Sequence, residues 1–172
     1  MKINFNYDTS VAQAPDPTAF KNAVQYVSNL YQSIFTNEVT ININIGFGEI
    51  NNYVMPKNSV GASLPSAYVG KYRYSDVQDA LVAHRVSAES LPSVDPTNGQ
   101  GIQMNLAEAR ALGLLIPDDA PAVDGYIGIS NAQSFYYGTT GSPAAGQYDL
   151  VATLEHELSE IMGRSNGGGG SK

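Results

Sequence analysis

The sequence predicts an α+β fold, in which a twisted mixed sheet of about four to five strands packs against two long helices. Residues 2–7 and 39–47 alternate apolar and polar side chains, which is the period of half-buried strands. Residues 18–35 and 148–162 instead repeat apolar side chains three and four positions apart, as amphipathic helices do. Two such helices can bury both apolar stripes on one face of a sheet.

The first half of the chain predicts a strand, a long helix and two further strands. In residues 39–47 the apolar side chains share one face, and this is the clearest strand pattern in the chain. Residues 49–55 are predicted to form a neighbouring strand that Pro56 ends. The stripe of the helix at residues 18–35 consists of Phe20, Ala23, Val24, Val27, Tyr31 and Ile34.

An insertion with short helices follows. Residues 57–74 are rich in Gly, Ser, Pro and Tyr and are predicted to be irregular. A short helix is expected from Ser75 to about residue 85, with Ser75 as its cap and Gln78 at the capping-box position.

The second half of the chain predicts a loop, a short helix, two strands and the last helix. Residues 89–101 are expected to form the loop, and Asn105 and Gly113 to begin and end the short helix. Residues 123–130 and 132–138 are predicted to form two short strands joined by a tight turn.

The length of 172 residues favours a single domain with a real core. We interpret residues 1–166 as one domain, the N-terminal part of a longer protein. Residues 167–172, "GGGGSK", have the composition of a flexible linker and are interpreted as an engineered addition.

Composition limits the partners and the chemistry. The net charge of −7 argues against nucleic acid and anionic membrane surfaces as partners. The chain has no cysteine, so disulfides and thiolate metal sites are excluded, and only His84 and His156 carry imidazole. His84, at the expected end of a helix, is interpreted as structural, with a distant metal ligand as the alternative. The N-terminus lacks the apolar region of a signal peptide, which leaves a cytoplasmic protein or export by another signal.

The segment "LEHELSEIMGR", residues 154–164, carries the strongest candidate site. On a helix, His156 and Glu160 lie one turn apart on the face opposite the apolar stripe, and Glu157 lies between the two faces. Imidazole and carboxylate at this spacing can hold one zinc ion, and Glu157 can act as the general base. The stripe that faces the core is Leu150, Leu154, Leu158 and Ile161.

The alternative interpretation is a solvated helix face. In that case Glu160 and Arg164 would form an i/i+4 ion pair that contributes about 0.2–0.5 kcal/mol. The pattern H-E-x-x-E is also less specific than the zinc-protease motif H-E-x-x-H.

The same segment resembles the active-site helix of metzincin-type zinc metalloproteases, whose motif is H-E-x-x-H-x-x-G-x-x-H. His156, Glu157 and Gly163 match in register. The order of a first strand, a long helix, several strands including an edge strand, and the motif helix is also similar. The resemblance implies that His156 is a zinc ligand, that Glu157 is the general base, and that Gly163 allows a sharp turn. The substrate would be a peptide or protein.

The sequence departs from that motif at two ligands. Glu160 stands in place of the second histidine and Asn166 in place of the third. The Met-turn and lower subdomain of such enzymes would follow residue 164 and are absent. The chain is in this respect similar to HExxE-type metalloprotease-like domains of large secreted bacterial proteins. Its lack of cysteine, its acidic charge and its lack of an N-terminal signal also resemble proteins exported by type I secretion, which implies an extracellular location. We therefore expect zinc-dependent peptide hydrolysis in the intact parent protein and weak or no hydrolysis by this chain.

A non-catalytic extracellular binding module is the second hypothesis. Tyr72, Tyr74, Tyr136 and Tyr137 lie among Gly, Ser and Thr residues, a composition that binding surfaces use. Carboxylates in "DPTNG" (95–99) and "PDDAPAVDG" (117–125) are candidate calcium ligands, although neither segment matches a calcium-binding motif. The sequence does not predict an oligomeric state.

Overall fold

The structure is a computed structural model, and it describes residues 1–84 and 91–164. The predicted helix end at residue 85, the start of the loop at residues 89–90, Asn166 and the linker at residues 167–172 lie outside the described residues. Within the described part, no helix is long and apolar enough to cross a membrane.

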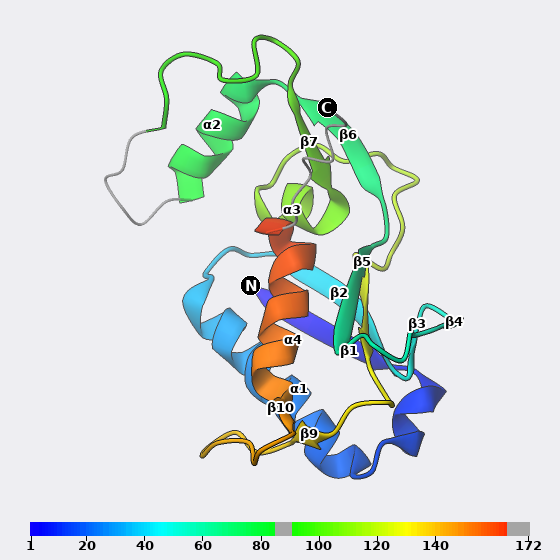
Figure 1. Cartoon of the computed structure of the whole chain (residues 1–172). Helices are drawn as coiled ribbons and strands as arrows, with labels where there is room; N and C mark the ends of the chain where they lie inside the picture. The colour runs from blue at the N-terminus through cyan, green and yellow to red at the C-terminus, as the bar shows by residue number, and fades with distance from the viewer. Residues whose placement is uncertain (85–90, 165–172) are drawn as a thin grey trace.

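A four-stranded sheet forms the centre of the fold (Figure 1). Its strands are β1 (Lys2–Tyr7), β2 (Thr40–Phe47), β8 (Gly125–Ile129) and β5 (Gly61–Pro65), in that spatial order. The first three run parallel, and β5 pairs antiparallel with β8 at one edge. The predicted α+β class and the mixed sheet are confirmed.

Two helices, α1 (Pro17–Ile34) and α4 (Leu150–Ser159), pack against each other and against the sheet. Asp16 caps α1 by accepting hydrogen bonds from two backbone N–H groups, and Pro17 occupies the first helical position. Between the helices and the sheet lies the main core, whose largest members are Phe20, Ile41, Ile43, Ile45, Ile127, Ile129, Leu150, Leu154, Leu158 and Ile161.

The outer edge of β1 is covered by polar side chains of α1. The Ser28 hydroxyl donates to the Ile3 carbonyl at 3.2 Å, and the Ile3 N–H donates to Gln32 Oε1 at 3.3 Å. These bonds occupy backbone groups that would otherwise be open to a strand of another chain. At the other edge of the sheet, no strand of the described residues pairs with the outer side of β5.

A second, smaller layer of structure lies at the end of the sheet away from β9 and β10 (Figure 1). It contains the antiparallel pair β6 (Tyr68–Tyr72) and β7 (Ile102–Asn105) and the short helices α2 (Tyr74–His84) and α3 (Leu106–Ala111). Its own core consists of Val77, Met104 and Ala109 with partly buried neighbours.

The two short helices were predicted with different success. Asn105 caps α3 as expected, because its side chain accepts from the Glu108 N–H at 2.9 Å, and Gly113 has the expected positive φ of 65°. The predicted cap of α2 is wrong, since the helix already begins at Tyr74. Gln78 donates to the Pro92 carbonyl at 3.1 Å and so holds the following loop.

The prediction that residues 57–74 are irregular is wrong, because they contain β5 and β6. Strand β5 lacks an apolar alternation because the motif helix lies close to it. A Cβ atom on Gly61 would lie 2.5 Å from Glu157 Oε1 and 2.9 Å from Thr153 Cγ2. This strand therefore has small residues at positions where strand prediction from sequence looks for large apolar side chains.

Residues 49–55 form a separate hairpin and no strand of the main sheet. In it, β3 (Glu49–Ile50) pairs with β4 (Tyr53–Val54), and both residues of the turn, Asn51 and Asn52, have positive φ. Asparagine tolerates this conformation better than most residues. The predicted neighbouring strand is therefore replaced by a tight turn directly after β2.

The strand predicted within residues 132–138 also pairs differently. Strand β9 (Phe135–Tyr136) pairs in parallel with β10 (Tyr148–Asp149), which directly precedes α4. It forms no hairpin with β8. This pairing and the contact of the Phe135 and Tyr148 rings hold the segment that directly precedes the motif helix.

Candidate metal site on the last helix

The faces of α4 are those that the sequence predicts. Asp149 caps the helix by accepting from the Ala152 N–H at 3.2 Å. The predicted apolar stripe is fully buried, with Leu154 only 1% exposed. His156 and Glu160 project from the other side, where their side chains are 55% and 33% exposed.

His156 and Glu160 are close enough to share one ion. His156 Nε2 lies 3.2 Å from Glu160 Oε1. Two ligand atoms that each lie ~2.0–2.1 Å from a tetrahedral zinc ion are about 3.3 Å apart. The second oxygen of Glu160 accepts a hydrogen bond of 2.5 Å from the Ser63 hydroxyl of β5, which orients the carboxylate. The pair therefore fits zinc in donor chemistry and in spacing.

The helix widens directly at this pair. Glu160–Arg164, η2, form a turn of π-helix that ends at Gly163 with φ of 109°, so the predicted role of Gly163 as helix end is confirmed. Arg164 turns back and donates to the Ser159 hydroxyl and to the His156 carbonyl. No Glu160–Arg164 ion pair forms among the described residues, and the solvated-face interpretation loses its proposed contact.

Glu157 differs from its two neighbours because it is buried. Glu157 is 7% exposed, and its side chain lies against Gly61. Burial raises the pKa of the Glu157 carboxyl above its usual value, and the negative charge of Glu160 raises that pKa further. A carboxyl with a raised pKa beside two candidate ligands has the property that a general base requires.

Replacement of Glu157 by glutamine is expected to change how stability depends on pH. The folded protein, kept free of metal with a chelator, binds the Glu157 proton more tightly than the unfolded chain does, because folding raises this pKa. The stabilisation is complete below the unfolded pKa of about 4.3 and is lost as pH rises through the folded pKa. Urea unfolding between pH 4 and pH 7 should therefore show that the free energy of unfolding of the Glu157→Gln variant increases relative to that of the wild type as pH rises.

The matched control is Glu38→Gln, which removes an exposed carboxyl. Its stability should run parallel to that of the wild type across the same range. Parallel profiles for Glu157→Gln as well would contradict the burial of a titrating carboxyl at this position.

A third ligand is not found near the pair. Within residues 1–84 and 91–164, no group of three or more His, Asp or Glu side chains could hold a metal ion. His84 ends α2 in the smaller layer and joins no such group with His156. The predicted position of a third ligand, Asn166, is outside the described residues.

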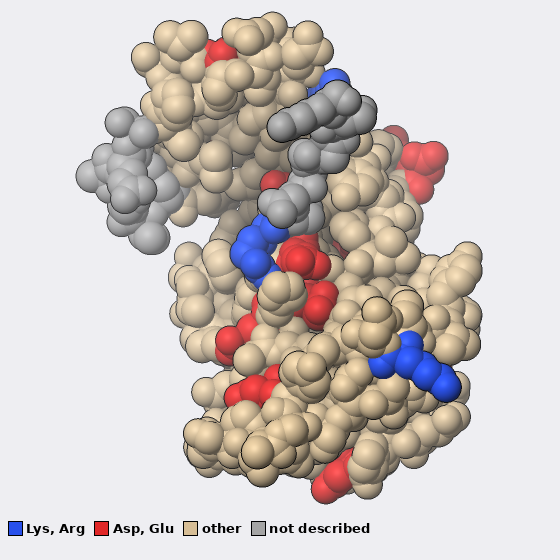
Figure 2. Space-filling model, viewed as in Figure 1, with Lys and Arg blue, Asp and Glu red and all other residues tan. Residues whose placement is uncertain are grey.

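The charge around the motif helix favours cations. Figure 2 shows several acidic side chains and one neighbouring basic side chain along the face that α4 occupies in Figure 1. The helix, its cap and η2 contain Asp149, Glu155, Glu157 and Glu160. Arg164 of η2 is the one arginine or lysine among the described residues of this segment, so acidic charge is in excess, and such an excess raises the local concentration of cations.

The four tyrosines of the second hypothesis do not form one surface. Tyr72 and Tyr74 belong to the smaller layer, whereas Tyr136 and Tyr137 lie in and after β9 at the opposite end of the molecule (Figure 1). The hydroxyls of Tyr72 and Tyr74 donate, each at 2.6 Å, to loop carbonyls of Leu115 and Pro92.

The second pair of tyrosines is also engaged within the chain. Tyr136 donates its hydroxyl proton to the Thr140 carbonyl, and Tyr137 packs against the main core. The hydroxyls of Tyr72, Tyr74 and Tyr136 thus hold loops in place.

Each of the two candidate calcium segments has one carboxylate that is engaged within the chain. Asp95 accepts from the Thr97 N–H at 2.8 Å, from the Thr97 hydroxyl at 2.7 Å and from the Gly99 N–H at 3.0 Å. Asp124 is fully buried and pairs with Arg110 at 2.7 Å. Both carboxylates therefore stabilise local structure, the first a turn and the second a junction between layers.

Sequence reasoning missed the contribution of β5 to the site. Ser63 holds Glu160, and Gly61 leaves room for Glu157, yet both lie in a segment that predicted no strand. Comparison of the chain with protein-family models, curated proteins and solved structures gives no match.

Proposed function

We propose that this chain is a zinc metallopeptidase-like domain in which His156 and Glu160 bind the metal and Glu157 is the general base. The observation that carries the proposal is the 3.2 Å separation of His156 Nε2 and Glu160 Oε1 on an accessible helix face, with a buried carboxyl at the intervening position. The substrate would be a peptide or protein, and the intact parent protein would hydrolyse it.

The open edge of β5 supports an extended peptide as the substrate. The Ser130 N–H donates to the Val60 carbonyl, and the Ser66 N–H donates to the Asp124 carbonyl, so even-numbered residues of this segment bond to β8. Because backbone groups alternate along an antiparallel strand, those of Gly61 and Ser63 point to the other edge. No strand pairs with that edge among the described residues. A substrate could therefore bind there as an added strand beside Glu160.

The residues of the chain divide the proposed chemistry between them. When bound, zinc would supply a Lewis acid that polarises the peptide carbonyl and lowers the pKa of water. Glu157 takes the proton of the attacking water and passes it to the leaving nitrogen, and its raised pKa suits both transfers. Ser63 keeps the Glu160 carboxylate oriented toward His156. The acidic surroundings counterbalance the charge of the ion.

Zinc titration by calorimetry near pH 7 tests the proposal. The wild type is expected to bind one zinc ion with micromolar affinity, because two protein ligands hold it less tightly than the three or four of well-formed sites. His156→Ala should abolish binding. The matched control, His84→Ala, removes the only other histidine and should bind as the wild type does.

Two results would contradict the proposal. Binding that survives His156→Ala, or that is lost equally in His84→Ala, would place the metal elsewhere. Failure of the wild type to bind zinc would contradict His156 and Glu160 as a zinc site in this chain and would favour a non-catalytic module.

A further inference from the structure

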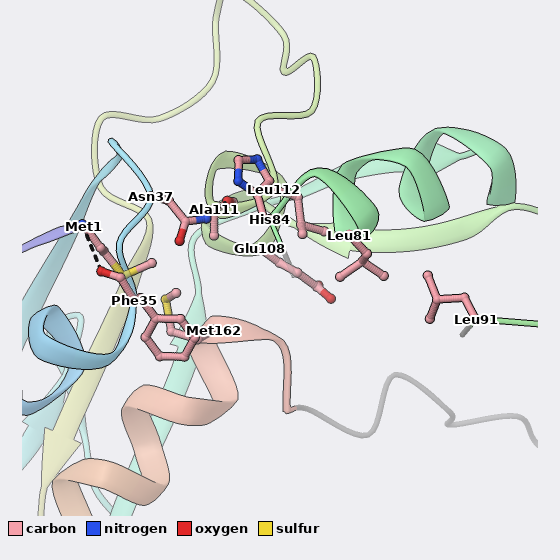
Figure 3. Close-up of a pocket in the computed structure, with 10 residues that line it drawn as sticks. All are labelled: Met1, Phe35, Asn37, Leu81, His84, Leu91, Glu108, Ala111, Leu112 and Met162. Carbon is pink, nitrogen blue, oxygen red and sulfur yellow. Dashed lines mark hydrogen bonds between the residues drawn. The ribbon is translucent and has the colours of Figure 1, made fainter. Parts of the chain in front are cut away.

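A cavity of about 420 Å³ lies between the end of α1, the two short helices and η2 (Figure 3). Its size falls within the range of small-molecule sites. It contains neither His156 nor Glu160 and is therefore distinct from the candidate metal site. Its walls are mainly apolar and come from Met1, Phe35, Leu81, Leu91, Leu112 and Met162.

Glu108 supplies the only carboxylate among the described residues that line the cavity. Its side chain extends from α3 into the space between Leu81 and Met162 (Figure 3). No ion pair of the described residues includes it, and its carboxyl accepts a hydrogen bond from the Asn105 backbone N–H at the start of α3. Burial raises the pKa of Glu108 by more than the hydrogen bond with the Asn105 backbone lowers it.

The other polar groups that line the cavity either donate hydrogen bonds within the chain or carry no negative charge. The Asn37 amide donates to the Ala111 carbonyl at 2.7 Å, and the Met1 ammonium donates to the Phe35 carbonyl at 3.1 Å. His84 makes no ion pair with Glu108. Among the described residues, the cavity thus offers apolar walls and one carboxylate that belongs to no ion pair.

We propose that this cavity binds a small molecule that combines an apolar body with a single ammonium group, the ammonium pairing with Glu108. Apolar walls favour the body by removing its surface from water. A charged hydrogen bond in a partly buried site is stronger than one in water, so the carboxylate selects a cation over a neutral ligand of the same shape.

The cavity adjoins the end of the motif helix. Met162 lines it, and Glu108 packs against Gly163, where a Cβ atom would lie 2.9 Å from the Glu108 carboxyl carbon. A ligand would therefore contact η2 directly, whether or not the metal site binds zinc. The proposal does not depend on the peptidase function.

Methionine-methyl NMR can test the site, because the chain has four methionines in distinct places. Met1 and Met162 line the cavity, whereas Met55 and Met104 are buried elsewhere. Titration with n-octylamine is expected to shift the methyl signals of Met1 and Met162 and to leave those of Met55 and Met104 in place. n-Octanol and n-octanoate are the matched probes, and both should bind at least tenfold more weakly.

Two variants separate the contribution of the Glu108 charge to binding from that of the apolar walls. Glu108→Gln keeps the shape of the side chain and should weaken n-octylamine binding at least tenfold, to the level of n-octanol. Asp79→Asn removes an exposed carboxylate of α2 outside the cavity and should leave the affinity unchanged. Unshifted Met55 and Met104 signals report that each variant is folded.

The proposal is overturned if n-octylamine does not bind, or if it binds the wild type no tighter than n-octanol. It is also overturned if the shifts spread to Met55 and Met104. The comparison of the three probes on the wild type decides the matter even if a variant fails to fold.

Discussion

Replacing Asp124 by alanine is expected to lower the free energy of unfolding by about 3–5 kcal/mol, the range found when one partner of a buried ion pair is removed. Asp124 is fully buried, accepts from Arg110 Nε at 2.7 Å and accepts from the Asn42 N–H at 2.8 Å. It thereby joins α3 to the strand β2. Urea unfolding of the variant and the wild type at neutral pH measures the effect.

Two control variants show how large the effect of Asp124→Ala is. Asp124→Asn keeps an acceptor for the Asn42 N–H and should destabilise less than alanine, because only the charge on Arg110 is left unmatched. Asp119→Ala removes an exposed carboxylate nearby and should stay within about 0.5 kcal/mol of the wild type. An Asp124→Ala effect as small as that of Asp119→Ala would contradict the role of this junction.

Leu154→Ala is expected to destabilise the fold by about 2–5 kcal/mol while zinc binding stays within a few-fold of the wild type. Leu154 is 1% exposed, so the substitution leaves a cavity in the main core. Its side chain faces away from His156, which projects to the opposite side of the same helix. Urea unfolding and calorimetric zinc titration of the same sample measure the two properties.

The matched control is Leu115→Ala, since this leucine is 90% exposed and the same substitution there should change stability by less than about 0.5 kcal/mol. His156→Ala should show the reverse of Leu154→Ala, with stability nearly unchanged and zinc binding lost. Loss of zinc binding in the folded Leu154→Ala protein would show that the two faces of α4 are not independent.

The sequence alone predicted the elements whose pattern is local. Strands β1, β2 and β8 and helices α1 and α4 carry a period of two or of 3.6 residues along their own length. The cap by Asn105 and the turn at Gly163 depend on the side chain or the conformation of a single residue. Each of these signals is complete within a few neighbouring positions.

The elements that sequence reasoning missed are short and defined by distant partners. Strand β5 is a strand because β8 pairs with it. Strand β9 was predicted, but its partner was missed, because β10 pairs with it from thirteen positions further along. Strands β6 and β7 pair across the whole of α2 and the loop after it. Their few residues carry no period long enough to indicate a strand.

What the sequence by itself determined at the candidate site is the helical spacing of His156 and Glu160 and the intermediate position of Glu157, because the period of the α-helix follows from its backbone hydrogen bonds. Only the tertiary structure decided that Glu157 is buried against Gly61, that Ser63 holds Glu160, and that the two tyrosine pairs lie apart. These contacts join residues up to about a hundred positions apart. Such contacts depend on how the layers pack, and no local pattern of residues encodes that packing.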